Sequence, residues 1–324
     1  MKPRSVVVIV ILLCCAVAYI GNASWLAPSV KENREILAHR GLHQTYSPVG
    51  VTSETCTASR INQPIHTYIE NTLVSMQAAI DFGADIVEFD VHPTTDGEFM
   101  VFHDWTLDCR TNGQGVVRDH SSRYLKQLDI GYGYTADDGK TYPFRGQDIG
   151  AMPTLKEVLN HFPEVNFMIN IKSKSGEEAR KLTAYLKTID TLNRTRLSLL
   201  ANGDAVTEFS RLNSDIKILS PAQAKSCLKF YVLLGWSGYV PKACHHTFVA
   251  VPENYQSLVW GWPNRFEARL IKAGSRSILM GPHKKGSAKS GIDSIQMLES
   301  IPDDYGGIIF TNRIDILGEG DSKN

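Results

Sequence analysis

Short apolar runs of β-strand character alternate with amphipathic helical patterns along this chain, and this alternation restricts the fold more than any other feature. Helical patterns occupy 71–84, 153–162, 176–190, 221–233, 264–273 and 292–300. Eight runs predict strands, at 35–39, 85–91, 166–172, 196–201, 215–219, 247–252, 275–280 and 306–311. Eight strand–helix units predict an α/β fold of the (β/α)8 TIM barrel type. A doubly wound sheet is the alternative, but no GxGxxG motif follows the first strand.

One stretch interrupts this alternation after the second predicted strand. Residues 90–104 read DVHPTTDGEFMVFHD, and the Asp96–Gly97 pair predicts a hairpin whose returning strand runs antiparallel to the end of strand two. Residues 105–150 follow, and they are too long for an ordinary barrel loop. We therefore predict an inserted cap segment at about 105–150 that lies over one mouth of the barrel. Residues 42–69 form a second long, polar loop.

The N-terminus has the features of a targeting segment. Lys2 and Arg4 precede an apolar run over 6–20, and the next charged residue is Lys31. Three interpretations of residues 1–23 stay open: a cleaved signal peptide, a retained membrane anchor in which 5–23 contact the membrane, or a buried core helix. In the first two, residues 24–324 form a domain outside the cytoplasm, either periplasmic or secreted, or anchored to the membrane.

Charge and cysteine content restrict the partners and the redox state. The 324 residues include 34 basic and 34 acidic side chains, a balance that gives no support for a nucleic-acid partner. In an exported domain Cys56, Cys109, Cys227 and Cys244 could form disulfides, with free thiols as the alternative. Cys227–Cys244 is the favoured pair because the two flank one local excursion. No CxxC motif occurs, so a structural zinc site is not expected.

Three carboxylates gather where predicted strands end, which is the mouth at which such barrels hold reacting groups. Glu88 and Asp90 are two residues apart on strand two, so both side chains point into the barrel. Glu70 precedes the first helix and reaches the same mouth. Buried carboxylates on one face are costly unless a cation lies between them. The three together predict a hard oxygen site for Mg²⁺ or Ca²⁺.

Two cations and two histidines are predicted beside these carboxylates. The first strand ends in His39 and Arg40, the hairpin returns His103, and the third long strand ends in Lys172. Arg40 and Lys172 suit a phosphate, and the two histidines can exchange protons near neutral pH. A divalent metal with these four groups is suited to cleaving a phosphodiester.

Four further residues are candidates at the same mouth. Asn71 follows Glu70, His92 continues the row of Glu88 and Asp90, and Asn170 shares a strand face with Lys172. Gly41 is expected to let the backbone approach the ligand and turn away.

Six short segments carry a resemblance to a known family. AHRG, IEN, VEFDVHPTTDG, VFHD, INIK and GIIFTN occur in order from about residue 35 to 315 and resemble the glycerophosphodiester phosphodiesterase family, whose fold is a phospholipase C-like barrel. The resemblance implies release of glycerol 3-phosphate and an alcohol from deacylated phospholipids, with a small-molecule glycerophosphodiester as substrate. Alternatives are a lysophospholipase D or sphingomyelinase D-like phosphodiesterase, and a catalytically silent barrel that binds lipid headgroups.

The same resemblance implies a role for each residue of the mouth. It makes His39 and His103 the acid/base pair and gives the phosphate to Arg40 and Lys172. It implies that the carboxylates of Glu70, Glu88 and Asp90 bind the divalent metal.

Three positions depart from the family's pattern. Asn170 stands where the family usually has glutamate, Thr311–Asn312 replaces a Thr-Asp pair, and the tryptophan usual near the seventh strand is missing around 279–283. The acid/base and phosphate-binding residues are intact. Substrate preference and metal affinity are therefore the properties that we expect to differ.

Overall fold

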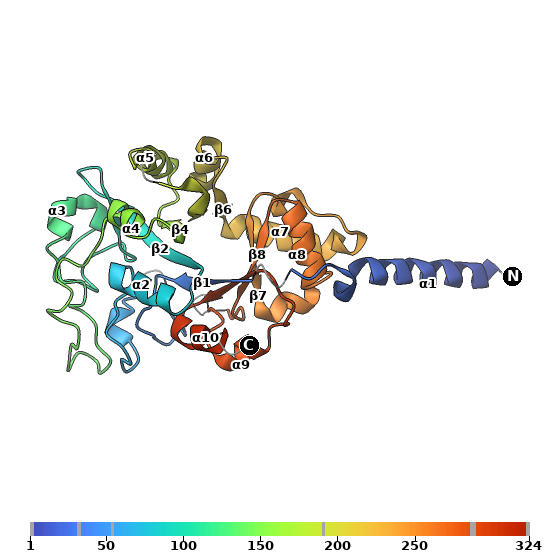
Figure 1. The fold of residues 1–324 in the computed structure, drawn as a ribbon, viewed down its shortest axis with the longest axis horizontal. Coiled ribbons are helices and arrows are strands. Elements are labelled where there is room, and N and C mark those ends of the chain that lie inside the picture. The colour runs from blue at the N-terminus through green and yellow to red at the C-terminus, as the bar shows by residue number, and fades with distance from the viewer. Residues whose placement is uncertain (1–2, 31–33, 53–54, 190–191, 286–289, 322–324) are drawn as a thin grey trace.

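The computed structural model describes residues 3–30, 34–52, 55–189, 192–285 and 290–321. Eight parallel strands of this part of the chain form one sheet in the order β6-β5-β4-β2-β1-β9-β8-β7, and β3 pairs with β2. A parallel bridge between Ile218 and Thr247 brings β6 and β7 together, so the barrel is nearly closed. The predicted (β/α)8 fold is confirmed (Figure 1). The strands are β1 (Glu35–His39), β2 (Ile86–Pro93), β3 (Phe99–Val101), β4 (Asn166–Ile171), β5 (Leu197–Leu200), β6 (Lys217–Leu219), β7 (Phe248–Pro252), β8 (Arg276–Met280) and β9 (Ile308–Thr311).

Helices cover the outside of the barrel, and most lie where the sequence predicts them. They are α1 (Pro3–Asn22), α2 (Leu73–Asp81), α3 (Ser122–Leu125), α4 (Leu155–His161), α5 (Gly176–Leu186), α6 (Asp204–Leu212), α7 (Pro221–Leu234), α8 (Asn264–Lys272), α9 (Ile295–Glu299) and α10 (Ile314–Asp321). The helices α3, α6 and α10 were not predicted. α5 ends before the predicted boundary, whose last residue, 190, lies outside the described residues.

Two helices begin later than predicted because capping residues precede them. Thr72 caps α2 with its side chain, and Asn71 before it has a left-handed backbone with φ 61°, so neither belongs to the helix. Thr154 caps α4 in the same way, and Glu157 completes the capping box by bonding back to the Thr154 amide.

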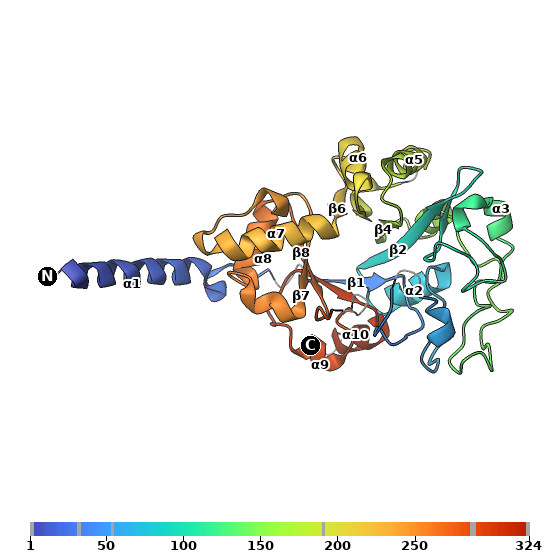
Figure 2. The ribbon, with the colours of Figure 1, turned by 180° about the vertical axis from the view of Figure 1, so that it is seen from behind.

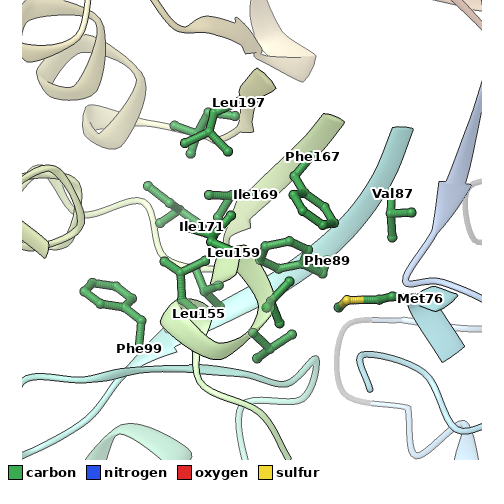
Figure 3. Packing of buried hydrophobic residues seen from close by; sticks show 14 of the residues in the cluster. Met76, Val87, Phe89, Phe99, Leu155, Leu159, Phe167, Ile169, Ile171 and Leu197 are labelled. Carbon is green, nitrogen blue, oxygen red and sulfur yellow. The ribbon is translucent and has the colours of Figure 1, made fainter. Parts of the chain in front are cut away.

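The main core lies between the sheet and the helices α2, α4, α5 and α6. Figure 3 shows its aromatic centre, where Phe89 of β2 and Phe167 of β4 meet edge to face at a centroid distance of 5.3 Å. Met76 of α2 and Leu159 of α4 pack against these strands and are buried. Each fully buried side chain of this size contributes about 1.5–3 kcal/mol relative to exposure. The site residues therefore stand on strands that a well-packed core holds in place.

The insertion builds a second core of its own at one end of the molecule (Figure 1). The predicted hairpin is confirmed, since β3 runs antiparallel to β2 with Val91 opposite Val101. Beyond it, residues 105–150 form mainly turns with the short helix α3. Their apolar side chains, such as Leu107 and Phe144, pack with Ile69 from the loop before α2.

Two disulfides connect the four cysteines of the domain. Cys227–Cys244 is confirmed and joins α7 to the segment before β7. Cys56–Cys109, which the sequence left open, joins the 42–69 loop to the insertion across 53 residues. Cys14 and Cys15 are free and exposed on α1.

α1 projects from the body at the end opposite the insertion, as Figure 2 also shows from behind. Residues Ser5–Asn22 have a mean hydropathy of 2.5, and their side chains are almost all exposed. By length and composition this helix can cross a membrane.

Candidate functional site

Sheet register places the predicted site residues side by side at the carboxyl ends of the strands. His39 of β1 is paired with Glu88 of β2, and Asp90 of β2 is paired with Asn170 of β4. After His39 the backbone of Arg40 takes a left-handed conformation with φ 61°, while its amide still bonds the Glu88 carbonyl at 2.9 Å. Such a backbone is strained for a side chain like arginine, and strain of this kind gathers at functional sites.

Gly41 serves a packing contact that the sequence did not predict. Its φ is +75°, and a Cβ atom there would lie 2.8 Å from the backbone of Ser75 in α2. The glycine thus lets the chain turn against the first helix, whereas we expected it to approach the ligand. The chain does turn away at Gly41 after the first strand, as expected.

Asp90 is the hub of the cluster. Its carboxylate lies 3.3 Å from Arg40 Nε and 3.3 Å from Lys172 Nζ. The side-chain amides of Asn170 and Asn71 donate hydrogen bonds to it at 2.8 and 3.2 Å. Burial alone would raise the pKa of Asp90, but Lys172, together with His103 and Arg40, holds it below its usual range. Both predicted phosphate-binding cations therefore stand over one ionised carboxylate.

Glu70 is held between two arginines. Arg40 donates to one of its oxygens at 2.9 Å, and Arg110 of the insertion lies 3.0 Å from the other. Burial opposes ionisation of Glu70, yet Arg110 and Arg40 lower its pKa to about 2. Glu70 is a carboxylate at neutral pH with both oxygens already paired.

Glu88 is the carboxylate of this site with the weakest contacts, the nearest of them His39 Nε2 at 3.8 Å. Its two oxygens are buried, and neither accepts a well-formed hydrogen bond from the described residues. Burial and the neighbouring Asp90 raise the pKa of Glu88 to about 8. A weakly contacted buried carboxylate beside a second one is the environment that a bound cation relieves. The donor set of Glu88, Asp90 and Glu70 is all carboxylate oxygen, which fits Mg²⁺ or Ca²⁺.

The described residues do not gather these carboxylates into a ready-made cage. No group of three or more His, Cys, Asp or Glu side chains in this part of the chain is close enough to hold a metal ion. Arg40 lies between Glu70 and Asp90 and pairs with both. The residues fit the chemistry of the predicted metal site, and Glu88 is the group that most requires a cation.

His39 is oriented by two residues that the sequence reasoning did not assign. Asn312, after β9, donates its amide to the Asp293 carboxylate at 2.9 Å, which fixes the amide oxygen toward His39. That oxygen lies 2.6 Å from His39 Nδ1, so Nδ1 carries the hydrogen. His39 Nε2 is left free to accept a proton, and it faces Glu88 at 3.8 Å. Burial, and next the charge of Arg40, lower the pKa of His39 well below 6.5.

His103 is held by the insertion. Asp104 lies 2.6 Å from His103 Nδ1, and because a carboxylate only accepts, Nδ1 again carries the hydrogen. Arg110 Nε donates to the other oxygen of Asp104 at 2.8 Å. Burial and Arg40 lower the pKa of His103, while Asp104 acts in the opposite direction.

Arg110 connects this histidine to Glu70. Its guanidinium donates to Asp104, to the hydroxyl of Tyr134 and, at 2.7 Å, to Thr57 of the 42–69 loop, besides its contact with Glu70. All of these groups are buried or partly buried. The neighbouring Cys109 is bonded to Cys56, so one disulfide supports this junction of the two long loops.

His92 lies on the insertion side of the sheet. Its ring packs edge-on against Trp105 at 5.4 Å, and its Nε2 lies 3.4 Å from the His103 carbonyl oxygen. Arg118 stacks on Trp105 at 4.5 Å and approaches His92 Nδ1. Burial, and next Arg118, lower the pKa of His92 to about 3, so it is neutral. Its contacts support the backbone that carries His103.

Four residues of the site were not assigned from sequence: Asp104, Arg110, Asp293 and Asn312. Two had a signal, because Asp104 belongs to the VFHD segment and Asn312 was noted as a departure in the late motif. Arg110 and Asp293 had no such signal. Arg110 contacts Glu70, which lies 40 residues away in the sequence, and Asp293 contacts Asn312, which lies 19 residues away.

A family model confirms the resemblance. Residues 39–228 match the model of the Glycerophosphoryl diester phosphodiesterase family. This is more than half of the chain, and it includes every predicted catalytic, phosphate-binding and metal-binding residue.

Solved structures share the fold. A glycerophosphodiester phosphodiesterase from Agrobacterium tumefaciens has a TM-score of 0.57 and 20% identity, covering 88% of this chain and 99% of its own. A phosphodiesterase from Oleispira antarctica, solved with the product sn-glycerol-3-phosphate, has a TM-score of 0.52 and 18% identity, covering 92% and 99%.

Curated relatives match over shorter stretches. A glycerophosphodiester phosphodiesterase of Caldanaerobacter subterraneus is 39% identical over 107 residues, which are 33% of this chain and 40% of that protein. The human Lysophospholipase D GDPD1 is 29% identical over 179 residues, 53% of this chain and 54% of that protein. The chain thus spans about two fifths to one half of the length of the curated relatives it matches. By its family model and its fold, this chain belongs to the glycerophosphoryl diester phosphodiesterase family.

Proposed function

We propose that this chain hydrolyses glycerophosphodiesters to glycerol 3-phosphate and an alcohol. The observation that carries the proposal is the cluster in which two cations and two oriented histidines surround the carboxylate of Asp90. Arg40 and Lys172 would bind the two non-bridging oxygens of a phosphodiester. The names of the relatives and the product bound to the Oleispira protein support the same substrate class.

The two histidines have different partners, and this divides their roles. His39 Nδ1 is bonded to a neutral amide, so His39 Nε2 suits a general base. His103 Nδ1 is bonded to Asp104, whose charge raises the pKa of His103 against the lowering by burial and Arg40, so a ring that has taken up a proton on Nε2 can act as the general acid. In the reaction, His39 takes the proton of the attacking hydroxyl as a new P–O bond forms. His103 gives a proton to the alcohol oxygen as the old P–O bond breaks. The attacking group is either water, which gives glycerol 3-phosphate directly, or a neighbouring hydroxyl of the substrate, which gives a cyclic phosphodiester that water then opens to glycerol 3-phosphate.

We further propose that a divalent ion, Mg²⁺ or Ca²⁺, binds Glu88, Asp90 and Glu70. When bound, such an ion stabilises negative charge on phosphoryl oxygens. The weakly contacted Glu88 supports this assignment. Asn170 donates its amide to Asp90, and this fixes the orientation of one ligand and adds no charge to the set.

We place the domain outside the cytoplasm. Two disulfides with well-separated partners support an oxidising compartment, because cytoplasmic thiols are kept reduced. Lys2 and Arg4 at the start of the chain support an orientation with the N-terminus in the cytoplasm and the domain outside.

A product assay tests the proposed activity. The purified full-length chain, in detergent with Mg²⁺ or Ca²⁺, would be offered glycerophosphocholine, glycerophosphoethanolamine, glycerophosphoglycerol and lysophosphatidylcholine. We expect glycerol 3-phosphate from at least one of the first three. His39→Ala and His103→Ala should each remove activity while circular dichroism stays unchanged. A folded chain that releases no product from any of these diesters would contradict the proposal.

Lysophospholipase D activity is the second candidate, favoured by the match to the human relative. In the same assay it would release choline from lysophosphatidylcholine at a rate equal to or above that from glycerophosphocholine. Release of choline without turnover of the three soluble diesters would replace the first proposal by the second.

A further inference from the structure

The base of α1 is bonded to the barrel. The Asn22 side chain donates to the Trp236 carbonyl at 2.7 Å and accepts from Arg269 at 2.8 Å. A second nitrogen of Arg269 donates to the Gly21 carbonyl at 3.1 Å. Asn22 at the end of α1 and Ala23 after it are buried, although nearly all the other side chains described for α1 are exposed. The helix therefore continues into the domain without a free linker between them.

Exposed apolar side chains surround this junction. They belong to three segments: η1 (Ser24–Leu26), the end of α7 with the residues that follow it, and the segment around Trp260. The first packs on α8, and the side chain of Trp260 donates to the Val232 carbonyl near the end of α7. Trp25 is 71% exposed and Leu233 is 59% exposed, and exposed apolar side chains that gather in one patch, rather than singly, mark an interaction surface. We name this surface the apolar collar: Trp25, Leu233, Leu234, Trp236, Tyr239 and Trp260.

The collar lies at the level where a membrane surface would be. α1 has 20 residues and is therefore about 30 Å long, the thickness of the hydrocarbon core of a bilayer. If α1 spans the membrane, Asn22 at its end lies at the boundary, and Trp236 lies there with it. Tryptophan and tyrosine are the residues that favour this boundary.

The charge around the collar fits an anionic surface. Residues 216–252 contain no Asp or Glu. The same stretch has Lys225, Lys229 and Lys242, all exposed, on α7 and before β7. Lysines beside an apolar surface are attracted to anionic headgroups.

We propose that α1 is retained as a membrane span and that the apolar collar rests on the outer surface of the bilayer. The barrel would then stand upright in one fixed orientation. Figures 1 and 2 both place α7 and α8 next to α1 and the insertion at the opposite end. Because the insertion holds His103, the catalytic mouth faces away from the membrane. The partner of the collar is the lipid bilayer.

Environment-sensitive labels test this orientation. The full chain with Cys14→Ser and Cys15→Ser would carry one added cysteine, Trp236→Cys in the collar or Ile149→Cys at the far end, where the native Ile149 is 65% exposed. Each variant is labelled with the fluorophore NBD and reconstituted in vesicles of phosphatidylcholine with about one third phosphatidylglycerol. Turnover of a soluble diester should be equal in both, which confirms that the labels leave the fold intact.

We expect the label at 236 to shift to the blue and to be quenched at least twofold by a nitroxide on the lipid headgroup region. The label at 149 should show neither change. Equal, water-like emission at both positions would overturn the proposal. Shielding at 236 that resists the lipid nitroxide and disappears on dilution would also overturn it, because a second copy of the chain would then cover the collar.

Two further measurements test the retained span and the charge. The mass of the protein extracted from membranes should include residues 3–23, and a mature chain that begins at Ser24 would overturn the proposal. Replacing Lys225, Lys229 and Lys242 by Gln should weaken quenching at 236 in vesicles with phosphatidylglycerol and leave it unchanged in phosphatidylcholine alone. If the parent and the triple Gln variant were quenched equally in vesicles with phosphatidylglycerol, as well as in phosphatidylcholine alone, the proposed attraction between these lysines and anionic lipid would be overturned.

Discussion

Asn312 illustrates how a single uncharged side chain can orient the proposed catalytic base. Its amide is held by Asp293, and its oxygen lies in a short hydrogen bond to His39 Nδ1, which holds the ring in one tautomer. Burial and the charge of Arg40 lower the pKa of His39, and the hydrogen bond to Asn312 opposes them only in part.

The pH dependence of activity should reflect this arrangement. Burial, then Arg40, lower the pKa of His39, so the ring stays neutral as the pH falls past 6.5 and gains a proton only below that value. We expect kcat/KM to begin its acidic decline below pH 6.5. Asn312→Asp places a carboxylate against Nδ1, so it should raise the pKa of His39 and move the decline to higher pH. A profile of Asn312→Asp identical to the parent would show that the contact does not govern the base.

Arg110 should be required for activity although it lies on the insertion. Arg110→Met leaves Asp104 and Glu70 buried without their shared partner, and breaking a buried pair costs about 3–5 kcal/mol. His103 also loses its support, and we expect kcat to fall by roughly 10²-fold, the lower range of an acid catalyst's contribution. Arg118→Met, beside His92 and Glu178, is the control and should retain most activity. Equal kinetic losses in the two variants would refute the specific role of Arg110.

The proposed metal dependence centres on Glu88. We expect excess EDTA to stop turnover and added Mg²⁺ or Ca²⁺ to restore it. Glu88→Gln removes the charge that Glu88 would carry beside a bound cation, so the metal concentration for half-maximal activity should rise at least roughly tenfold. Titration of activity with metal measures this change. Full activity of the parent in EDTA would exclude the proposed ion.

At the level of elements, the two disulfides should stabilise the fold by similar amounts, but only one of them lies beside the candidate site. The chain-entropy model gives about 4 kcal/mol for the 53-residue loop of Cys56–Cys109 and about 3 kcal/mol for the 17-residue loop of Cys227–Cys244. The first bridge supports the junction at Arg110, whereas the second lies between α7 and β7.

Removing each bridge should separate stability from catalysis. Replacing Cys56 and Cys109 by Ser should lower both the free energy of unfolding and kcat. Replacing Cys227 and Cys244 by Ser should lower the free energy of unfolding about as much as the first replacement does, but it should leave kcat unchanged. Urea titration and turnover of a soluble diester measure the two effects. Full kcat in the first variant would show that the loops hold Arg110 without the bridge.

The strands could be predicted from the sequence because each is a short apolar run with turn residues on both sides, and β1 lies where expected at Glu35–His39. α6 was missed because its first turn follows Gly203 with a positive φ and no side-chain cap precedes it. The contact between His39 and Asn312 joins residues 273 apart. Sequence spacing predicts contacts within one strand, such as Glu88 and Asp90, but contacts between loops depend on the folded barrel.

At the scale of the whole molecule, the insertion lies at one end, and α1, α7 and α8, around which the proposed collar lies, are at the other end (Figure 1). If the collar rests on lipid, substrates must arrive from water. In proteoliposomes we expect glycerophosphocholine to be hydrolysed at the rate seen in detergent, within about twofold. Lysophosphatidylcholine in the same bilayer should be hydrolysed at least roughly tenfold more slowly than in mixed micelles, where the mouth can reach it. Choline release measures both rates, and fast turnover of the bilayer lipid would contradict the upright orientation.

The Cys56–Cys109 bridge would also set the moment at which the proposed activity reaches its full rate. In a reducing compartment the two thiols stay unpaired, so the two long loops are not joined beside Arg110. Arg110 would then hold Glu70 and Asp104 less firmly. If the domain is exported as proposed, the newly made chain should work slowly until oxidation forms the bridge, and cytoplasmic diesters would be largely spared during synthesis.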